Sequence, residues 1–200
     1  MGALKDNHIV KRSGSQMVKV FEGLFPGKTF LEIAYNTPNE YVQMYWNTFK
    51  QQYPDATVNL NGKIFEIIIY TLLYREGIRP FYTQAKVAFV PNIDFDAILY
   101  NKNTPVSLSL KTSLRERYKQ ADLEAIALKY VHRKSISYLL TLNPDEANSV
   151  KEKINNGAVI GLDSVIDCNT DEINLLVENL KKMNFIESET IDVVSGFIVK

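Results

Sequence analysis

The chain has 200 residues, of which 46% are hydrophobic and 23% charged, and its 23 basic and 23 acidic residues give a formal net charge of zero. This composition is typical of a soluble globular protein with one sizeable core, or a core with a short appendage. The single cysteine, Cys168, excludes an internal disulfide and fits a reducing, cytoplasmic compartment. No apolar run reaches membrane-spanning length and the N-terminus lacks a hydrophobic signal core, so we expect neither membrane insertion nor secretion.

The first third of the chain predicts helices. Residues 1–14 are polar and without periodicity, so we expect a flexible N-terminal arm. Residues 15–53 carry two helical patterns. Asn61-Gly62 then opens a strongly apolar helix through Tyr74, which Gly77 and Pro80 end. We expect residues 15–200 to form a single domain.

The rest of the chain alternates between strands and helices. The predicted elements are strands at about 80–90, 93–100 and 105–111, a helix at 113–132, a strand at 136–142, a helix at 143–157, a strand at 158–165, a helix at 171–183 and a final edge strand at 191–199. The order α-β-β-β-α-β predicts an α/β domain with a mixed β-sheet flanked by helices.

Charge is unevenly distributed along the chain. Residues 99–135 hold eight basic and three acidic residues, a balance of +5, whereas residues 163–192 hold eight acidic and two basic residues, a balance of −6. A chain without net positive charge is poorly suited to DNA overall, because phosphate contacts dominate DNA affinity. A basic centre can still bind DNA on one face, although two solvated helix surfaces would give the same pattern.

Acids and a lysine occur on the two central predicted strands. Asp94 and Asp96 share one strand face, and burying such an acid among apolar residues is costly unless a cation meets it. Asp96 is favoured because apolar residues follow it directly, whereas Asp94 fits a turn at the strand start equally well. Ser109 and Lys111 share a face of the next strand. Carboxylate oxygens for Mg²⁺ and a nearby cation are what metal-dependent phosphodiester cleavage requires.

Two helical acids extend this pattern. Gln120 and Glu124 lie one turn apart and can face the same point, although Glu124 fits a solvated position too. Glu66 interrupts an otherwise apolar helix, which a single exposed face would explain. The chain lacks the residues for two other kinds of site. Two histidines and one cysteine do not make a zinc site, and no glycine-rich loop for binding phosphate occurs.

The stretch from about Gly62 to Leu142 resembles the PD-(D/E)XK nuclease superfamily, the fold of most type II restriction endonucleases. In that family an Asp on the second core strand is followed by a (D/E)xK tripeptide on the third strand and by a helix. Ser109-Leu110-Lys111 occupies the tripeptide position, with Ser in place of the carboxylate. The chain resembles a subset in which the acid lies on the next helix, where Glu124 follows Lys111 by thirteen positions.

The resemblance implies a restriction-endonuclease-like core at about 61–165 and a Mg²⁺-dependent DNA endonuclease in a bacterial or archaeal cytoplasm. It implies Asp96, with Asp94 as its rival, and Glu124 as metal ligands, Glu66 as a further ligand and Lys111 as a catalytic residue. Ser109 and Gln120 would support the site. The basic residues expected to contact DNA are Lys102, Arg115, Arg117 and Lys119.

The expected partners are double-stranded DNA, a second copy of the chain if the target is palindromic, and a functionally paired DNA methyltransferase. Two alternatives stay open. A repair or recombination nuclease can use the same core. A non-catalytic DNA-binding or assembly subunit can keep the fold, and Ser109 in the acidic position favours that reading.

Overall fold

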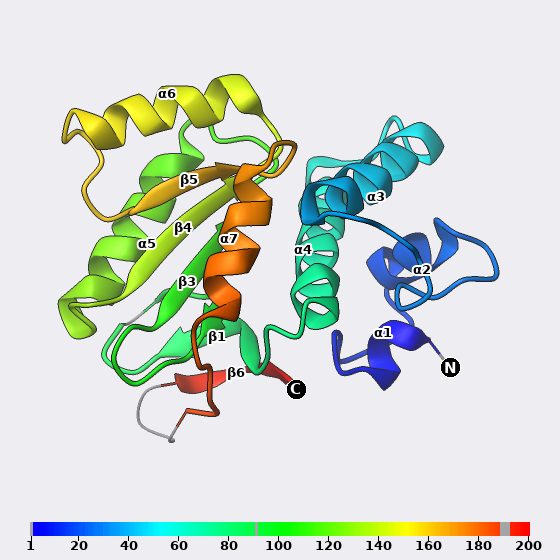
Figure 1. Ribbon diagram of the computed structural model, residues 1–200, viewed down its shortest axis with the longest axis horizontal. Coiled ribbons are helices and arrows are strands. Elements are labelled where there is room, and N and C mark those ends of the chain that lie inside the picture. Colours follow the sequence, from blue (N-terminus) through cyan, green and yellow to red (C-terminus); the bar gives the residue numbers. More distant parts are fainter. Residues whose placement is uncertain (1, 91, 189–192) are drawn as a thin grey trace.

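The structure is a computed structural model that describes residues 2–90, 92–188 and 193–200, and it is built around a six-stranded mixed sheet (Figure 1). The strands are β1 (Phe81–Val87), β2 (Phe95–Leu99), β3 (Val106–Leu110), β4 (Ile136–Thr141), β5 (Ser164–Asp167) and β6 (Val193–Val199). The helices are α1 (Ala3–Asp6), α2 (Gln16–Gly23), α3 (Pro38–Gln52), α4 (Val58–Arg75), α5 (Arg117–Val131), α6 (Pro144–Asn155) and α7 (Glu172–Lys181). The expected α/β class, with a mixed sheet flanked by helices, is confirmed.

The strand order is β5-β4-β3-β2-β1-β6. The β1–β2, β2–β3 and β1–β6 pairs are antiparallel, whereas β3–β4 and β4–β5 are parallel. Strand β3 is therefore where the sheet changes from antiparallel to parallel pairing. The β2–β3 register begins at Ala97–Leu108, while β3 stays paired with β4 as far as Leu110–Leu140. The two central strands separate beyond Ala97, and this opening positions the candidate site.

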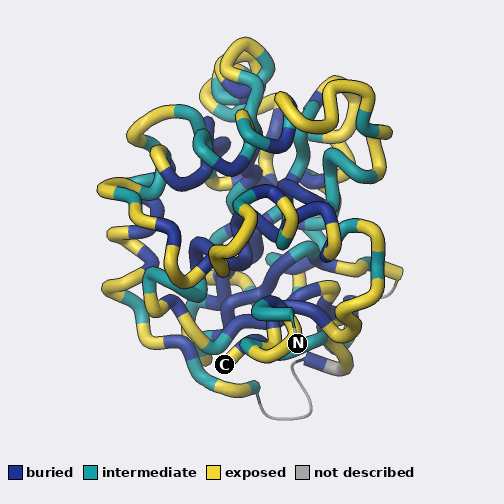
Figure 2. The backbone as a smooth tube through the Cα atoms, turned by 90° about the vertical axis from the view of Figure 1, so that its right-hand side faces the viewer, coloured by how far each residue is buried: buried dark blue, intermediate teal, exposed yellow. Residues whose placement is uncertain are grey.

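Helices cover both faces of the sheet. The alternate β3 residues Val106, Leu108 and Leu110 join the main core with α4 and α7. On the other face, α5 and α6 pack over β4 and β5 through Ala125, Val150 and their neighbours. Figure 2 shows the buried residues gathered in the middle of the molecule and the exposed residues at its periphery. Ser107 and Ser109 point toward α5, because side chains alternate along β3.

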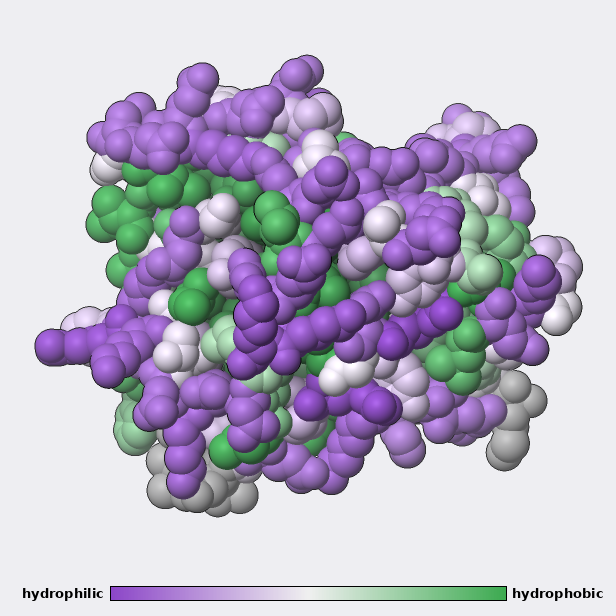
Figure 3. Space-filling model, viewed as in Figure 1, coloured by the Kyte–Doolittle hydropathy of each residue, from purple (hydrophilic) through white to green (hydrophobic). Residues whose placement is uncertain are grey.

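Helix α4 is buried on almost every side. Its residues from Ile67 to Leu73 are all buried, since α2 and α3 pack on one side and β3 on the other. Thr57 caps the helix by accepting a hydrogen bond from the Leu60 N–H, 3.2 Å away. In the part of the chain that the structure describes, α4 and the other helices are too short or too polar to cross a membrane. The face seen in Figure 3 is mainly hydrophilic, and its hydrophobic surface lies in separate patches.

The N-terminal segment differs from the expected flexible arm. Over residues 2–14 it forms α1 and a turn, and Leu4, Ile9 and Val10 are buried in the main core. Leu4 also donates its backbone N–H to Glu22 Oε1 at 3.0 Å. Three apolar residues without helical spacing gave no periodic signal, yet together they bury enough surface to fix the segment.

The fifth strand is shorter than expected and begins later, at Ser164. Residues 160–162 donate their three backbone N–H groups to Asp122 Oδ1 on α5, at 3.2, 2.6 and 3.2 Å, instead of extending the sheet. Gly161 permits this approach, because a Cβ there would lie 2.4 Å from the Asp122 carbonyl oxygen. A side-chain carboxylate thus takes the backbone donors that the apolar sequence suggested for a strand.

Candidate functional site

The candidate site lies where β2 and β3 separate. Asp96, the residue of β2 just before the paired region, has no strand partner across the opening. Its Oδ2 atom accepts the backbone N–H of Leu110 at 2.8 Å. The carboxylate thereby takes the place of a ladder hydrogen bond, and the opening of the sheet holds it in a fixed position.

Lys111 completes a largely buried ion pair at this point. Its Nζ lies 2.7 Å from Asp96 Oδ2, and the two side chains are only 14% and 13% exposed. The backbone N–H of Lys111 donates to the Leu140 carbonyl oxygen at 3.0 Å, so the residue still follows β4. A cation and a carboxylate at this depth are each costly without the other, which fixes the lysine amine beside the acid.

Glu124 faces the same pair from α5. Burial, the largest influence, raises the pKa of Glu124; the hydrogen bond from Gln120 and the positive charge of Lys111 oppose the rise, and the charge of Asp96 adds to it. Gln120 Nε2 donates to Glu124 Oε1 at 2.7 Å. The charges of Lys111 and Asp96 both act on Glu124, so the three side chains lie in one neighbourhood.

A small cavity separates the two acids. It has a volume of about 10 Å³ and is lined by Asp96, Ser109 and Glu124 among its residues. This is close to the smallest space that holds one water-sized sphere. Ser109 Oγ is buried there without a hydrogen-bond partner. Buried hydroxyls are normally paired, so this oxygen is available to whatever enters the cavity.

Glu66 approaches from α4, which packs on the main-core face of β3. Burial raises the pKa of Glu66, the neighbouring Lys63 lowers it, Asp96 raises it and Lys111 lowers it, in that order of size. Lys63 Nζ lies 2.8 Å from Glu66 Oε2. Tyr70, one turn further along α4, donates its hydroxyl to the Asp96 carbonyl oxygen at 2.7 Å. The carboxylates of Glu66 on α4 and Glu124 on α5 thus lie near the Asp96–Lys111 pair.

Lys63 and Tyr70 were missed by the sequence reasoning. Both lie within one helical turn of Glu66, at spacings of three and four residues, so they share its face of α4. That spacing was the available signal. It gave no reason to connect Tyr70 to Asp96, because the contact crosses between two elements.

Asp94 does not reach the site. Its carboxylate pairs with Lys86 on β1 at 3.7 Å, and the two side chains are 57% and 55% exposed. Asp94 precedes β2 and its ion pair lies on the surface. Asp94 is therefore a solvent-exposed acid at the start of the strand. Between the two rivals, the structure places Asp96 beside Lys111.

The predicted DNA-contacting residues are divided between the two ends of the strands. Lys102 lies in the turn between β2 and β3, at the opposite end from Asp96, and is not brought to the site. Arg115 and Arg117 are exposed in the segment that leads from Lys111 into α5. Lys119, in the first turn of that helix, pairs with Glu116.

The donors fit a hard cation in type but are not gathered as a ligand cage. Among residues 2–90, 92–188 and 193–200, no three His, Cys, Asp or Glu side chains are grouped to hold a metal ion. Each acid has a polar partner instead: Lys111 for Asp96, Lys63 for Glu66 and Gln120 for Glu124. Burial raises the pKa of Glu66 and of Glu124, and a cation bound beside either carboxylate would favour its ionised form.

Comparisons with protein-family models, curated proteins and solved structures give no match to this chain. The functional argument therefore rests on the residues themselves and their geometry.

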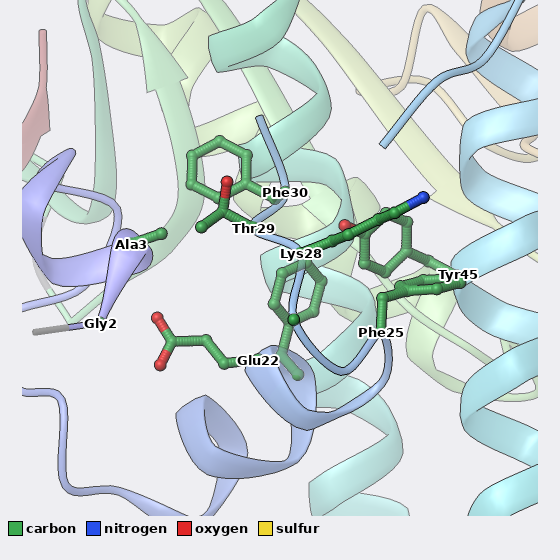
Figure 4. A pocket seen from close by; sticks show the side chains of 10 residues that line it. Gly2, Ala3, Glu22, Phe25, Lys28, Thr29, Phe30 and Tyr45 are labelled. Carbon is green, nitrogen blue, oxygen red and sulfur yellow. The ribbon is translucent and has the colours of Figure 1, made fainter. Parts of the chain in front are cut away.

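A separate pocket lies away from this site, among α1, α2 and the loop that follows α2. Figure 4 shows the rings of Phe25 and Tyr45 close together, with the Phe30 ring apart from them and the Glu22 carboxylate across the pocket from Phe25 and Tyr45. Its volume is about 220 Å³. Glu22 already accepts the Leu4 backbone N–H, and the phenylalanine and tyrosine rings pack on one another, so the pocket reads as a gap in the N-terminal packing.

Proposed function

We propose that this protein is a Mg²⁺-dependent DNA endonuclease of the type II restriction class, built on a restriction-endonuclease-like core. The observation that carries the proposal is the largely buried Asp96–Lys111 pair at the opening between β2 and β3, with Glu124 across a small cavity from Asp96. A largely buried acid–amine pair, with a second acid whose pKa is raised by burial close to it, is a combination that favours a functional site.

Lys111 supplies the positive charge of the proposed reaction. Its amine is held by Asp96 at 2.7 Å, so it does not need to reorganise when negative charge develops on the scissile phosphate. The same amine can orient the attacking water and hold its position against the phosphorus. Fixed donors of this kind act most strongly where water is excluded, and this pair is largely buried.

Asp96 and Glu124 would hold the metal, with Glu66 as a further ligand. When bound, Mg²⁺ stabilises charge on the phosphate and makes the attacking water more acidic. Glu124 has a raised pKa without a cation, and a divalent ion beside it favours its ionised form. Gln120 fixes one oxygen of that carboxylate, and Ser109 is small enough to leave room for it.

Double-stranded DNA is the proposed substrate. Arg115 and Arg117 are exposed in the segment following Lys111, where guanidinium groups suit phosphate contacts. A homodimer would match a palindromic target, because each active site then cuts one strand. A DNA methyltransferase would be the functional partner that protects host DNA.

The test is a cleavage assay on supercoiled plasmid and linear duplex DNA. We expect cleavage with Mg²⁺, none with EDTA, and binding without cleavage in Ca²⁺. A protein that binds duplex DNA but cuts neither substrate with Mg²⁺ or Mn²⁺ would overturn the nuclease proposal.

Binding of duplex DNA without any cleavage would support a non-catalytic DNA-binding subunit. Ser109 in the acidic position of the tripeptide and the lack of a three-acid group among the described residues favour this candidate. A repair or recombination nuclease would instead cut, with preference for a damaged, branched or single-stranded substrate over intact duplex.

A further inference from the structure

A cleft lies beside the candidate site, between the N-terminal segment, α4 and the β1–β6 edge. Its volume is about 400 Å³, and its floor includes the apolar side chains of Ile9, Met17 and Phe197. This is the size range of ligand-binding clefts. The N-terminal segment forms one wall because Ile9 and Val10 anchor it in the core.

The cleft adjoins the proposed catalytic residues. Glu66 and Tyr70 both line it. Glu66 is close enough to Asp96 and Lys111 for their charges to shift its pKa, and the Tyr70 hydroxyl donates to the Asp96 carbonyl oxygen at 2.7 Å. A DNA strand that lies in the cleft would therefore pass close to the Asp96–Lys111 pair.

The walls of the cleft carry uncompensated positive charge. Lys11 and Arg12 line it, and they also line a second, open hollow of about 520 Å³ that includes Lys5. Eight lysines in the described ranges form ion pairs with carboxylates, but Lys5, Lys11 and Arg12 form none with described residues. Lys11 Nζ instead lies 5.7 Å from the centroid of the Phe197 ring. Two hollows that share Lys11 and Arg12, cations without an ion-pair partner among the described residues, suit an extended polyanion better than a small anion.

A strained residue lies on the cleft wall. Gln84 has a φ of 48° within β1, where the β1–β6 register shifts between Thr83 and Lys86. A bulge of this kind turns a side chain out of the normal alternation, and a left-handed glutamine is unfavourable. The exposed amide of Gln84 is thereby directed to the cleft, beside Tyr70.

We propose that this cleft binds the DNA backbone next to the scissile phosphate, with Lys11 and Arg12 of the N-terminal segment contacting phosphates. The inference rests on the proposed nuclease function and adds a DNA-contacting surface on the α4 side of the site. Arg115 lies just before α5 and Arg117 is its first residue, and α5 covers the other face of the sheet. DNA would then be held by contacts on both sides of the Asp96–Lys111 pair.

The test measures duplex binding by the full chain at several salt concentrations, in Ca²⁺ so that no DNA is cut. Each phosphate contact contributes about −0.9 to the slope of log K against log salt concentration. We expect the double variant Lys11→Ala/Arg12→Ala to lower the magnitude of that slope by about 2. The charge-keeping variant Lys11→Arg/Arg12→Lys should keep it.

The matched control is Arg133→Ala/Lys134→Ala, which removes the same two charges from an exposed pair beyond the C-terminal end of α5. This control should bind with the wild-type slope. A wild-type slope for Lys11→Ala/Arg12→Ala, or an equal fall in the control, would overturn the cleft assignment. Mg²⁺-dependent cleavage by the wild type would still support the nuclease proposal in that case. A chain that binds no duplex even at low salt would overturn both.

Discussion

Two lysine–aspartate pairs lie close together in this chain and differ in almost every physical respect. Lys111 and Asp96 are 2.7 Å apart and 14% and 13% exposed, whereas Lys86 and Asp94 are 3.7 Å apart and 55% and 57% exposed. The acids are two residues apart in sequence and identical in type. The difference comes from the position of the two acids in the fold. The sheet opens at Asp96, and α4 and α5 cover that opening. Burial, rather than residue type, makes one pair a candidate site.

The largest contrast is expected in cleavage by variants of the two acids. Asp96→Asn should lower the single-turnover rate of Mg²⁺-dependent cleavage by at least about 10²-fold, because it removes a metal ligand and the partner of Lys111. Asp94→Asn should cut at nearly the wild-type rate, since its pair is exposed. Rapid-quench kinetics on a labelled duplex measure both. Equal losses would show that the two acids act together.

A second contrast concerns the acid on the helix. Glu124→Ala should lose most cleavage, because a carboxylate gives a hard cation charge that a hydroxyl does not. Ser109→Ala should keep substantial activity. The double variant Ser109→Asp/Glu124→Ala should recover part of the loss by returning the acid to β3. The same kinetic assay decides, and full activity of Glu124→Ala would refute the relocation of the acid.

The pairs should also differ in stability. Lys111→Ala leaves a largely buried carboxylate without its cation and should lower the free energy of unfolding by about 1–3 kcal/mol. Lys86→Ala removes an exposed pair and should cost about 1 kcal/mol or less. Urea unfolding followed by circular dichroism at pH 7 measures both. A larger cost for Lys86→Ala would contradict the role given to burial.

The smallest expected effect is in the pH dependence of stability. Because burial raises the pKa of Glu124, the folded state binds its proton more tightly than the unfolded state. Stability therefore falls as pH rises from the unfolded pKa of about 4.3 through the raised folded value. Glu124→Gln should be more stable than the wild type above that window and should lose this advantage below about pH 4. Melting temperatures of both proteins, measured without divalent ions from about pH 3 to 8, test this.

The sequence predicted most of the elements, whereas the chemistry of the site stays a prediction. Asp96 and Lys111 could be chosen because strand alternation is a local property, and Glu124 because the family resemblance implies an acid on the following helix. The choice between Asp94 and Asp96 stayed open, since it depends on where β2 and β3 separate, which follows from pairing with β4.

The misses share a physical cause. Leu4, Ile9 and Val10 bury against distant elements without any local periodicity, so the segment was taken for a flexible arm. The segment before β5 is held by hydrogen bonds from its backbone N–H groups to Asp122, which lies 38 to 40 residues away in the sequence. The basic cleft depends on both the N-terminal segment and the bulge at Gln84, and neither is visible in local patterns.

The central claim is tested most directly by the single-turnover cleavage rate of Lys111→Ala in Mg²⁺, measured beside its binding of the same duplex in Ca²⁺. The account predicts a rate at least about 10²-fold below the wild type with DNA affinity nearly unchanged, because the amine acts mainly on charge that develops in the transition state. A Lys111→Ala protein that is folded, binds DNA and cuts at a near wild-type rate would contradict it.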